Sequence, residues 1–231
     1  MPLGVVGRNM PRSRPPVIAW SGTVYRATTY DVPLWVLPNR RDGRWNAAGN
    51  GSTQYACLDS EAPFAEMLRG QDLRDEADAQ TFRTVLWQLR VDEGAIVDYS
   101  TFAKAQAAGF PPDALVDDDQ ERCRAEAHRL QRLGVSGVLS PSAALPDSVN
   151  LTIFGPRVAV DWTTKVTLAS MVPAQRLTEG GAPPGLVART RFYGERHAGL
   201  VAYETGQEPL FPAPPEQRPE SRRRPRPDAQ Q

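Results

Sequence analysis

Short apolar segments separated by glycine and proline run along most of this chain, and their order limits the folds it can adopt. Residues 81–91 alternate in the two-residue period of a half-buried strand, with Val85, Trp87 and Leu89 on one side. Shorter strands are predicted at 17–20, 23–25, 54–58, 95–99, 135–139, 149–154, 158–160, 166–172, 186–192 and 200–203. Helical spacing is confined to 60–69, 101–108 and 119–133. Without regular strand–helix alternation, this order favours an α+β domain over a doubly wound parallel sheet.

The two ends of the chain differ from its middle in composition. Residues 1–16 are rich in proline and arginine and contain no apolar stretch, so they predict a disordered arm and not a secretory signal. Residues 206–231 contain seven prolines and the arginine cluster 222–224, which predicts a disordered tail. One folded domain is therefore expected over residues 17–205.

The charge balance excludes some classes of partner. Lys+Arg and Asp+Glu both count 27, so the formal net charge is zero and binding to nucleic acid by bulk charge is not expected. Hydrophobic residues make up 40% of the chain, enough for a packed core. No run approaches the roughly 18 apolar residues of a membrane span. We expect a cytoplasmic protein without a direct nucleic-acid or membrane partner.

Cysteine and histidine are too sparse for a disulfide scaffold or a metal centre. Cys57 and Cys123 are the only cysteines, and reduced thiols are the default in the cytoplasm. His128 and His197 lie far apart and have no cysteine at ligand spacing. No metal site is predicted.

Three residues in the first third of the chain have the chemistry of a ligand site. Arg44 lies in the turn at 43–46, and an arginine holds phosphate with a planar set of donors. Tyr55 offers a flat face for a ring, and Glu66 can stabilise a developing cation or orient a nucleophile. Together they predict a cavity for a phosphate-bearing ligand with an aromatic head, such as a dinucleotide. Alternatively, Arg44 is a surface residue, Tyr55 belongs to the core and Glu66 is solvated.

Common catalytic and nucleotide-binding motifs are absent from the sequence. Gly49 and Gly51 begin a dinucleotide-binding fingerprint, but Gln54 replaces its third glycine and no long helix follows. The sequence contains no P-loop, no HExxH and no Gly-x-Ser-x-Gly. Glu66 also has no obvious second carboxylate for glycoside hydrolysis.

Six short motifs nevertheless follow one another in a recognisable order. They are Tyr25-Arg26-Ala27, Gly43-Arg44-Trp45-Asn46, Tyr55-Ala56, Ala65-Glu66-x-Leu68-Arg69, Gly137-Val138-Leu139-Ser140-Pro141-Ser142 and Asn150-Leu151-Thr152-Ile153-Phe154. The series resembles the RES domain, a family named for its Arg, Glu and Ser and found in toxins of bacterial type II toxin–antitoxin pairs. The resemblance covers residues 17–172.

The resemblance implies a fold and an activity. RES domains resemble ADP-ribosyltransferases, with two mixed β-sheets around a cleft and a few short helices. Members degrade NAD+ by breaking the bond between nicotinamide and ribose, with water or inorganic phosphate as the acceptor. NAD+ is then a substrate and not a cofactor, phosphate a potential co-substrate, and an antitoxin protein the expected partner. Whether the protein forms a homo-oligomer is left undecided by the resemblance.

The resemblance also assigns residues. Its naming trio, expected to be catalytic, matches Arg44, Glu66 and Ser142. Ser142 is preferred over Ser140 because of the Pro-Ser step of the family. The positions expected to bind the substrate are Tyr25, Arg26, Trp45, Asn46 and Tyr55.

The chemistry of NAD+ cleavage gives each group a role. Glu66 would stabilise the positive charge that develops on the ribose, and Arg26 and Arg44 would hold the pyrophosphate. Tyr55 would stack on nicotinamide, while Ser142 would hold the carboxamide or a ribose hydroxyl.

Two other functions stay open at this point. The first is transfer of ADP-ribose to a macromolecule, although the chain lacks the Glu-x-Glu pair typical of arginine-specific transferases. The second is a catalytically inactive module that binds a nucleotide or an antitoxin.

Overall fold

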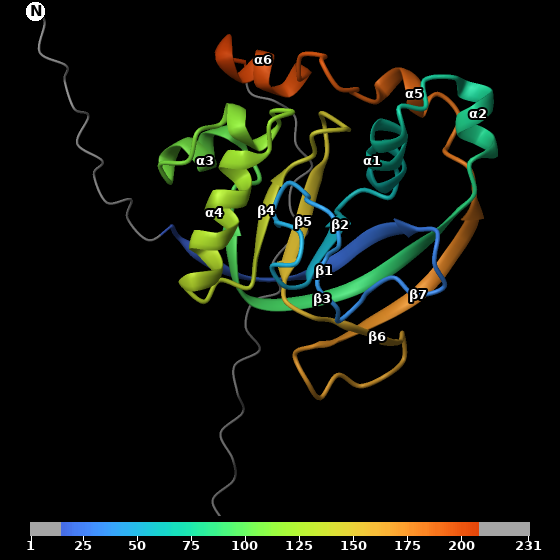
Figure 1. Cartoon of the computed structure of the whole chain (residues 1–231), viewed down its shortest axis with the longest axis vertical. Coiled ribbons are helices and arrows are strands. Elements are labelled where there is room, and N and C mark those ends of the chain that lie inside the picture. The colour runs from blue at the N-terminus through green and yellow to red at the C-terminus, as the bar shows by residue number, and fades with distance from the viewer. Residues whose placement is uncertain (1–14, 208–231) are drawn as a thin grey trace, which may run out of the picture.

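The computed structural model describes residues 15–207, which form a seven-stranded mixed sheet with short helices packed against it (Figure 1). The strands are β1 (Val17–Thr28), β2 (Thr53–Cys57), β3 (Thr84–Asp98), β4 (Gly137–Pro141), β5 (Val149–Phe154), β6 (Val158–Asp161) and β7 (Met171–Gly180). The helices are α1 (Ala62–Gln71), α2 (Glu76–Thr81), α3 (Phe102–Ala107), the 3₁₀ helix η1 (Asp113–Leu115), α4 (Glu121–Arg132), α5 (Leu186–Arg189) and α6 (Ala198–Glu204). The α+β class is confirmed. The predicted disordered ends, 1–16 and 206–231, fall almost entirely outside the described residues.

The sheet closes on itself at one end. Its strand order is β1-β2-β5-β4-β3-β7-β6, and β1 also pairs with β3, so five strands form a ring from which β7 and β6 extend. The β3–β4 and β6–β7 pairs are parallel, and the other neighbours are antiparallel. The expectation of two mixed sheets is therefore wrong, because hydrogen bonds link all seven described strands into one sheet.

The lengths of β1 and β3 explain this closure. They have 12 and 15 residues, and their register runs from Val17 opposite Val97 to Thr28 opposite Val85. A shift in register between Ile18 and Trp20 marks a bulge, which increases the local bend of a strand. Strand β3 thus pairs with β7 at its start and with β4 at its end, while β1 pairs with β3 along its whole length and meets β2 near Tyr25.

Several predicted elements match the structure, and others merge. The strand predicted at 149–154 is β5, and the helices predicted at 60–69, 101–108 and 119–133 are α1, α3 and α4 within about two residues. The separate strands predicted at 17–20 and 23–25 are one strand, β1. Likewise, 84–91 and 95–98 of two predicted strands both belong to β3, whereas Thr81, predicted to begin the first of them, ends α2.

Other predicted elements are wrong. The segments 186–192 and 200–203, predicted as strands, contain the helices α5 and α6, and the strand predicted at 166–172 begins only at Met171. Helix α2 was not predicted. A short apolar run does not distinguish a strand from a buried helical turn by its periodicity. For α6 the deciding group is His197, whose ring Nδ1 accepts the Leu200 N–H at 3.1 Å and caps the helix.

The core has three parts that hold the helices against the ring. One apolar cluster takes side chains from all five ring strands, including Trp20, Ala56, Leu89, Leu139 and Leu151, so the ring is packed and not a channel. A second cluster lies under α3 and α4, and a third lies between α1 and α5. Figure 1 shows α3 and α4 on one side of β4 and β5, and α1 on the other.

Candidate active site

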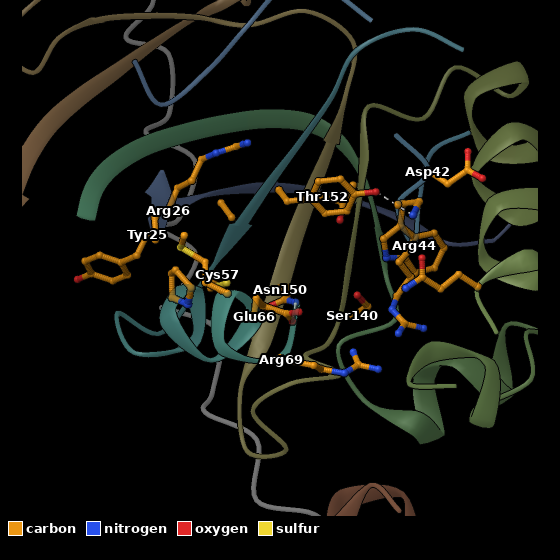
Figure 2. Close-up of a pocket in the computed structure, with 18 of the residues that line it drawn as sticks. Tyr25, Arg26, Asp42, Arg44, Cys57, Glu66, Arg69, Ser140, Asn150 and Thr152 are labelled. Atoms are coloured by element: carbon orange, nitrogen blue, oxygen red, sulfur yellow. Dashed lines mark hydrogen bonds between the residues drawn. The ribbon is translucent and has the colours of Figure 1, made fainter. Parts of the chain in front are cut away.

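A cavity of about 420 Å³ lies where β1, β2 and β5 meet α1 and the loop between β1 and β2 (Figure 2). Its volume falls within the usual range for small-molecule sites. Its lining residues are Tyr25, Arg26, Ala27, Asp42, Gly43, Arg44, Trp45, Tyr55, Ala56, Cys57, Pro63, Glu66, Met67, Arg69, Gln120, Ser140, Asn150, Thr152 and Tyr193. Arg44 and Glu66, on which the sequence-based prediction of a ligand cavity depends, both belong to this set.

Glu66 presents a fixed carboxylate to the cavity. Helix α1 has proline in its first turn and buries Ala62, Ala65 and Leu68 against the core, which leaves Glu66 half-buried at the cavity. Oε1 of Glu66 accepts hydrogen bonds from Ser142 Oγ and Asn150 Nδ2, both at 2.8 Å. Both bonds reach the same oxygen, so the other oxygen can face a ligand.

Ser142 lies behind Glu66 and does not line the cavity. Its side chain is fully buried, and Oγ accepts the backbone N–H groups of Ala144 and Leu145 at 3.2 and 3.1 Å while donating to Glu66. The role expected of Ser142 in holding a ligand group stays a prediction; the structure shows its hydroxyl bonded to the carboxylate of Glu66. Ser140, two residues earlier, lines the cavity instead.

Arg26 and Arg44 each have a buried nitrogen without a partner. Arg44 Nη1 donates to the carbonyl oxygens of Asp117 and Ala114 at 2.8 and 3.4 Å, whereas Nη2 is buried and unpaired. The guanidinium of Arg26 lies 4.1 Å from the centre of the Trp35 ring, and its Nη1 is also unpaired. Burial lowers the pKa of Arg26 to about 10. Both arginines have donors available for an anion.

Unpaired polar atoms are concentrated around this cavity. Eight buried side-chain nitrogen or oxygen atoms lack a hydrogen-bond partner among residues 15–207, and five of them belong to residues that line the cavity. These five atoms are Arg26 Nη1, Arg44 Nη2, Arg69 Nε, Asn150 Oδ1 and Thr152 Oγ1. Buried polar groups are normally paired in folded proteins, so this cluster of exceptions marks a place where a polar ligand or water can supply the missing partners.

The aromatic residues of the motif hold the loop that carries Arg44. Tyr55 Oη accepts the Trp45 N–H at 2.9 Å and donates to Asn46 Oδ1 at 2.8 Å, so its hydroxyl is already used. Trp45 is 1% exposed and packs near Phe110, with the ring centres 6.2 Å apart. Asn46 donates to the Arg41 carbonyl oxygen and does not line the cavity.

Six of the eight site residues predicted from the sequence therefore line one cavity, and two do not. Tyr25, Arg26, Arg44, Trp45, Tyr55 and Glu66 belong to the lining, whereas Asn46 and Ser142 support it. Their chemical roles stay predictions.

Arg69, Asn150 and Tyr193 are among the lining residues that the sequence-based assignment missed. Arg69 lies three positions after Glu66, a spacing that places both on one face of α1 and could have identified it. Asn150 opens one of the six motifs, but the pairing of β5 with β2, which leads into α1, is needed to bring it to Glu66. Tyr193 is far away in the sequence, and no local pattern indicates it.

Two features are absent from residues 15–207. No group of three or more His, Cys, Asp or Glu side chains in this range is arranged to hold a metal ion. Also within this range, no helix combines the length and apolar character needed to cross a membrane.

Curated mycobacterial proteins are similar in sequence to part of this chain. NAD(+) phosphorylase MbcT of Mycobacterium tuberculosis (strain ATCC 25618 / H37Rv) is 28% identical over 130 residues, which cover 54% of this chain and 70% of MbcT. The Mycobacterium bovis protein of the same name gives the same values. A chain in the crystal structure of the M. tuberculosis MbcT–MbcA toxin–antitoxin complex matches with a TM-score of 0.55 at 24% identity, covering 74% of this chain and 90% of that chain. That likeness shows a shared fold.

A family model gives the broader assignment. The model described as the RES domain matches residues 23–171, a range that includes β1 from Thr23, both residues that hold Glu66, and Glu66 itself. The match covers more than half of the chain and the elements that build the cavity. The chain belongs to the RES domain family.

Proposed function

We propose that this protein degrades NAD+ by cleaving the bond between nicotinamide and ribose, with water or phosphate as the acceptor. One observation carries the proposal: a fixed carboxylate shares a cavity with three arginines that have unpaired buried nitrogens. Membership of the RES domain family and similarity to proteins named NAD(+) phosphorylase support it.

The arrangement suits the charge changes of this reaction. When the bond between the ribose and nicotinamide breaks, positive charge develops on the ribose and nicotinamide leaves as a neutral molecule. The carboxylate of Glu66 would stabilise that charge, because it is held by Ser142 and Asn150 and needs little rearrangement during the reaction. Arg26 and Arg44 would bind the pyrophosphate through their unpaired donors.

We further propose that the protein acts as a toxin that a cognate antitoxin neutralises. The relative of known structure was crystallised as a toxin–antitoxin complex. Expression of the protein alone should then arrest growth, and co-expression of a neighbouring small protein should relieve the arrest. Unimpaired growth despite high levels of folded protein would contradict the toxin role.

The activity can be tested directly with purified protein. NAD+ is added with and without inorganic phosphate, and free nicotinamide and labelled protein are measured. Free nicotinamide without labelled protein supports the proposal, whereas labelled protein would indicate transfer of ADP-ribose to a macromolecule. Intact NAD+ under both conditions would overturn the enzymatic function.

Glu66→Gln tests the role of the carboxylate. The amide oxygen of Gln can still accept the hydrogen bonds of Ser142 and Asn150, so the fold should persist while nicotinamide release falls roughly 10²–10³-fold. Glu61→Gln is a matched control at the N-terminus of the same helix, α1. Glu61 pairs with Arg189 and does not line the cavity. Equal turnover in the Glu66→Gln and Glu61→Gln variants would remove Glu66 from the mechanism.

A further inference from the structure

Arg69 is a cavity residue whose side chain is held from two sides. Its Nη2 donates to Asp118 Oδ1 at 2.6 Å, and its guanidinium carbon lies 4.2 Å from the centre of the Tyr193 ring. The residue is 3% exposed, yet its Nε has no hydrogen-bond partner among the described residues. An arginine fixed in this way can bind an anion with little further loss of side-chain entropy.

Arg69 and Arg44 lie at the same end of the cavity. Figure 2 shows the side chain of Arg69 extending toward that of Arg44, with Ser140 beside them and Arg26 at the other end. Arg44 also has an unpaired buried nitrogen, Nη2. Burial lowers the pKa of Arg69; the carboxylate of Glu66 acts in the opposite direction, and the nearby positive charges of Arg44 and Arg191 lower the pKa further.

The carboxylates around this pair do not neutralise it fully. Asp118 is shared, since its Oδ1 contacts Arg69 at 2.6 Å and Arg191 at 2.9 Å, and its Oδ2 accepts the Gly194 N–H at 2.7 Å. One carboxylate between two guanidinium groups leaves a positive charge uncompensated. Glu66 and Asp42 also line the cavity and carry negative charge, but among the described residues neither forms an ion pair with Arg44 or Arg69.

We propose that Arg69 and Arg44 form an oxyanion subsite next to Glu66 that takes a tetrahedral phosphate group. The inference rests on the function proposed above and adds Arg69 to the binding residues. The phosphate group has two potential sources, the pyrophosphate of NAD+ or free inorganic phosphate. Arg26, at the other end of the cavity, is the donor for a second anionic group.

If free phosphate occupies the subsite, it is placed to attack the ribose. An oxygen of HPO₄²⁻ forms the new bond to the anomeric carbon and its proton is released to solvent. The electron pair of the broken carbon–nitrogen bond stays on nicotinamide, which leaves neutral. The products are nicotinamide and ADP-ribose 1-phosphate, and no oxidant or reductant is required.

Arg69→Gln and Arg69→Lys test the subsite, with Arg74→Gln as the control. In both Arg69 variants Asp118 keeps Arg191 and the Gly194 N–H, so the fold should persist, and Arg69→Lys retains the charge without the planar donors. Arg74 stacks on Phe192 at 4.3 Å beside Tyr193 and pairs with Asp72 and Glu195 outside the cavity lining. The loss of a charge-assisted hydrogen bond predicts a decrease in binding of roughly 10- to 100-fold.

Binding and turnover are both measured. Calorimetry gives the dissociation constants of inorganic phosphate and of ADP-ribose, and steady-state kinetics give KM for NAD+ and for phosphate. Weaker phosphate binding and a higher KM for phosphate place the acceptor at Arg69. Weaker ADP-ribose binding and a higher KM for NAD+ place the pyrophosphate there.

The failures of the two proposals can be distinguished. Dissociation constants and KM values in both Arg69 variants that match those of Arg74→Gln would overturn the subsite, even if NAD+ is degraded. Arg69-dependent binding of phosphate or ADP-ribose without nicotinamide release would keep the subsite and overturn the enzymatic function.

Discussion

The hydroxyl group of Ser142 links the loop between β4 and β5 to Glu66 on α1. The hydroxyl accepts two backbone N–H groups and donates to Glu66, and the Ser142 carbonyl oxygen contacts His197 Nε2 at 3.0 Å. The residue that matches the serine of the family's name therefore contacts Glu66 directly and lies outside the cavity lining.

Ser142→Ala should reduce both stability and turnover. The backbone N–H groups of Ala144 and Leu145 lose their buried acceptor, which should lower the free energy of unfolding by about 1–3 kcal/mol. Glu66 keeps only Asn150 as a described side-chain donor, so nicotinamide release should also fall. Urea unfolding and the NAD+ assay measure the two effects.

Ser148→Ala is the control in the same loop. The Ser148 side chain is equally buried, but its hydroxyl has no partner among the described residues. Removing an unpaired buried hydroxyl should change the free energy of unfolding by less than about 0.5 kcal/mol, or increase it. The assigned role of Ser142 fails if the two variants show equal stability and equal turnover.

At the scale of elements, the turn at 43–46 presents Arg44 to the cavity. The Gly43 N–H donates to the Asn46 carbonyl oxygen at 2.9 Å, and Tyr55 ties Trp45 and Asn46 to β2. A Cβ on Gly43 would lie 2.6 Å from both Asn46 Oδ1 and Tyr55 Oη. Only glycine fits between these two side chains.

Gly43→Ala should loosen this turn and weaken ligand binding. The added methyl group separates Tyr55 from Asn46, so KM for NAD+ should rise roughly tenfold, the effect of losing about 1.4 kcal/mol of binding free energy. Gly70→Ala on α1 is the control, since its Cβ would have no neighbour within 4 Å. That substitution should raise the free energy of unfolding by roughly 0.5–1 kcal/mol without changing KM. An unchanged KM in Gly43→Ala would show that Arg44 does not depend on the turn.

Local patterns predicted the elements whose periodicity is long or sharply bounded. Helix α4 and strand β5 were found from the sequence because their apolar spacing is continuous and Gly134 or Gly155 follows each with positive φ. The pairing of β1 with β3 could not be predicted in this way, because it joins segments about 70 residues apart and depends on tertiary packing. The strands predicted at 186–192 and 200–203 were wrong because a short apolar run fits a strand and a buried helical turn equally well, and tertiary packing decides between them.

The site was predictable where its residues share a motif and hidden where tertiary contacts bring them together. Arg44 and Glu66 were singled out by their chemistry and then matched to the naming residues of the RES domain, and both line the cavity. Asn150 reaches it only after β5 pairs with β2, and Tyr193 only after the segment that follows α5 folds back onto Asp118. The residues next to Asn150 and Tyr193 in the sequence do not indicate these tertiary contacts.

At the scale of the whole molecule, the segment after β7 braces the cavity from outside the family match, which ends at residue 171. The Arg191 N–H donates to the Ala144 carbonyl oxygen at 2.7 Å, Gly194 contacts Asp118, and His197 contacts Ser142. Figure 1 shows α5 next to α1 and α6 next to α3, so the segment runs along the ends of both groups of helices. A substitution that destabilises the segment after β7 should therefore also disturb the positions of Ser142 and Asp118 next to the cavity.

His197 gives this coupling a dependence on pH. Its Nδ1 accepts the Leu200 N–H, so Nε2 carries the proton and donates to the Ser142 carbonyl oxygen. Burial, more than any other cause, lowers the pKa of His197 from 6.5 to about 4. The unfolded chain therefore binds a proton more readily than the folded one, and the stabilisation is complete above about pH 6.5 and lost as the pH falls toward about 4.

The wild-type free energy of unfolding should drop by about 2 kcal/mol between about pH 7.5 and about pH 5 through His197 alone. His197→Asn keeps a side chain that can cap α6 and cannot titrate in this range, so its loss over the same interval should be smaller by that amount. Urea unfolding of both proteins at the two pH values isolates this contribution, because the remaining titrating groups are common to both. If the two proteins lose equal stability, His197 is not the buried neutral group that links α6 to Ser142, and the brace on the cavity must depend on Arg191 and Asp118 instead.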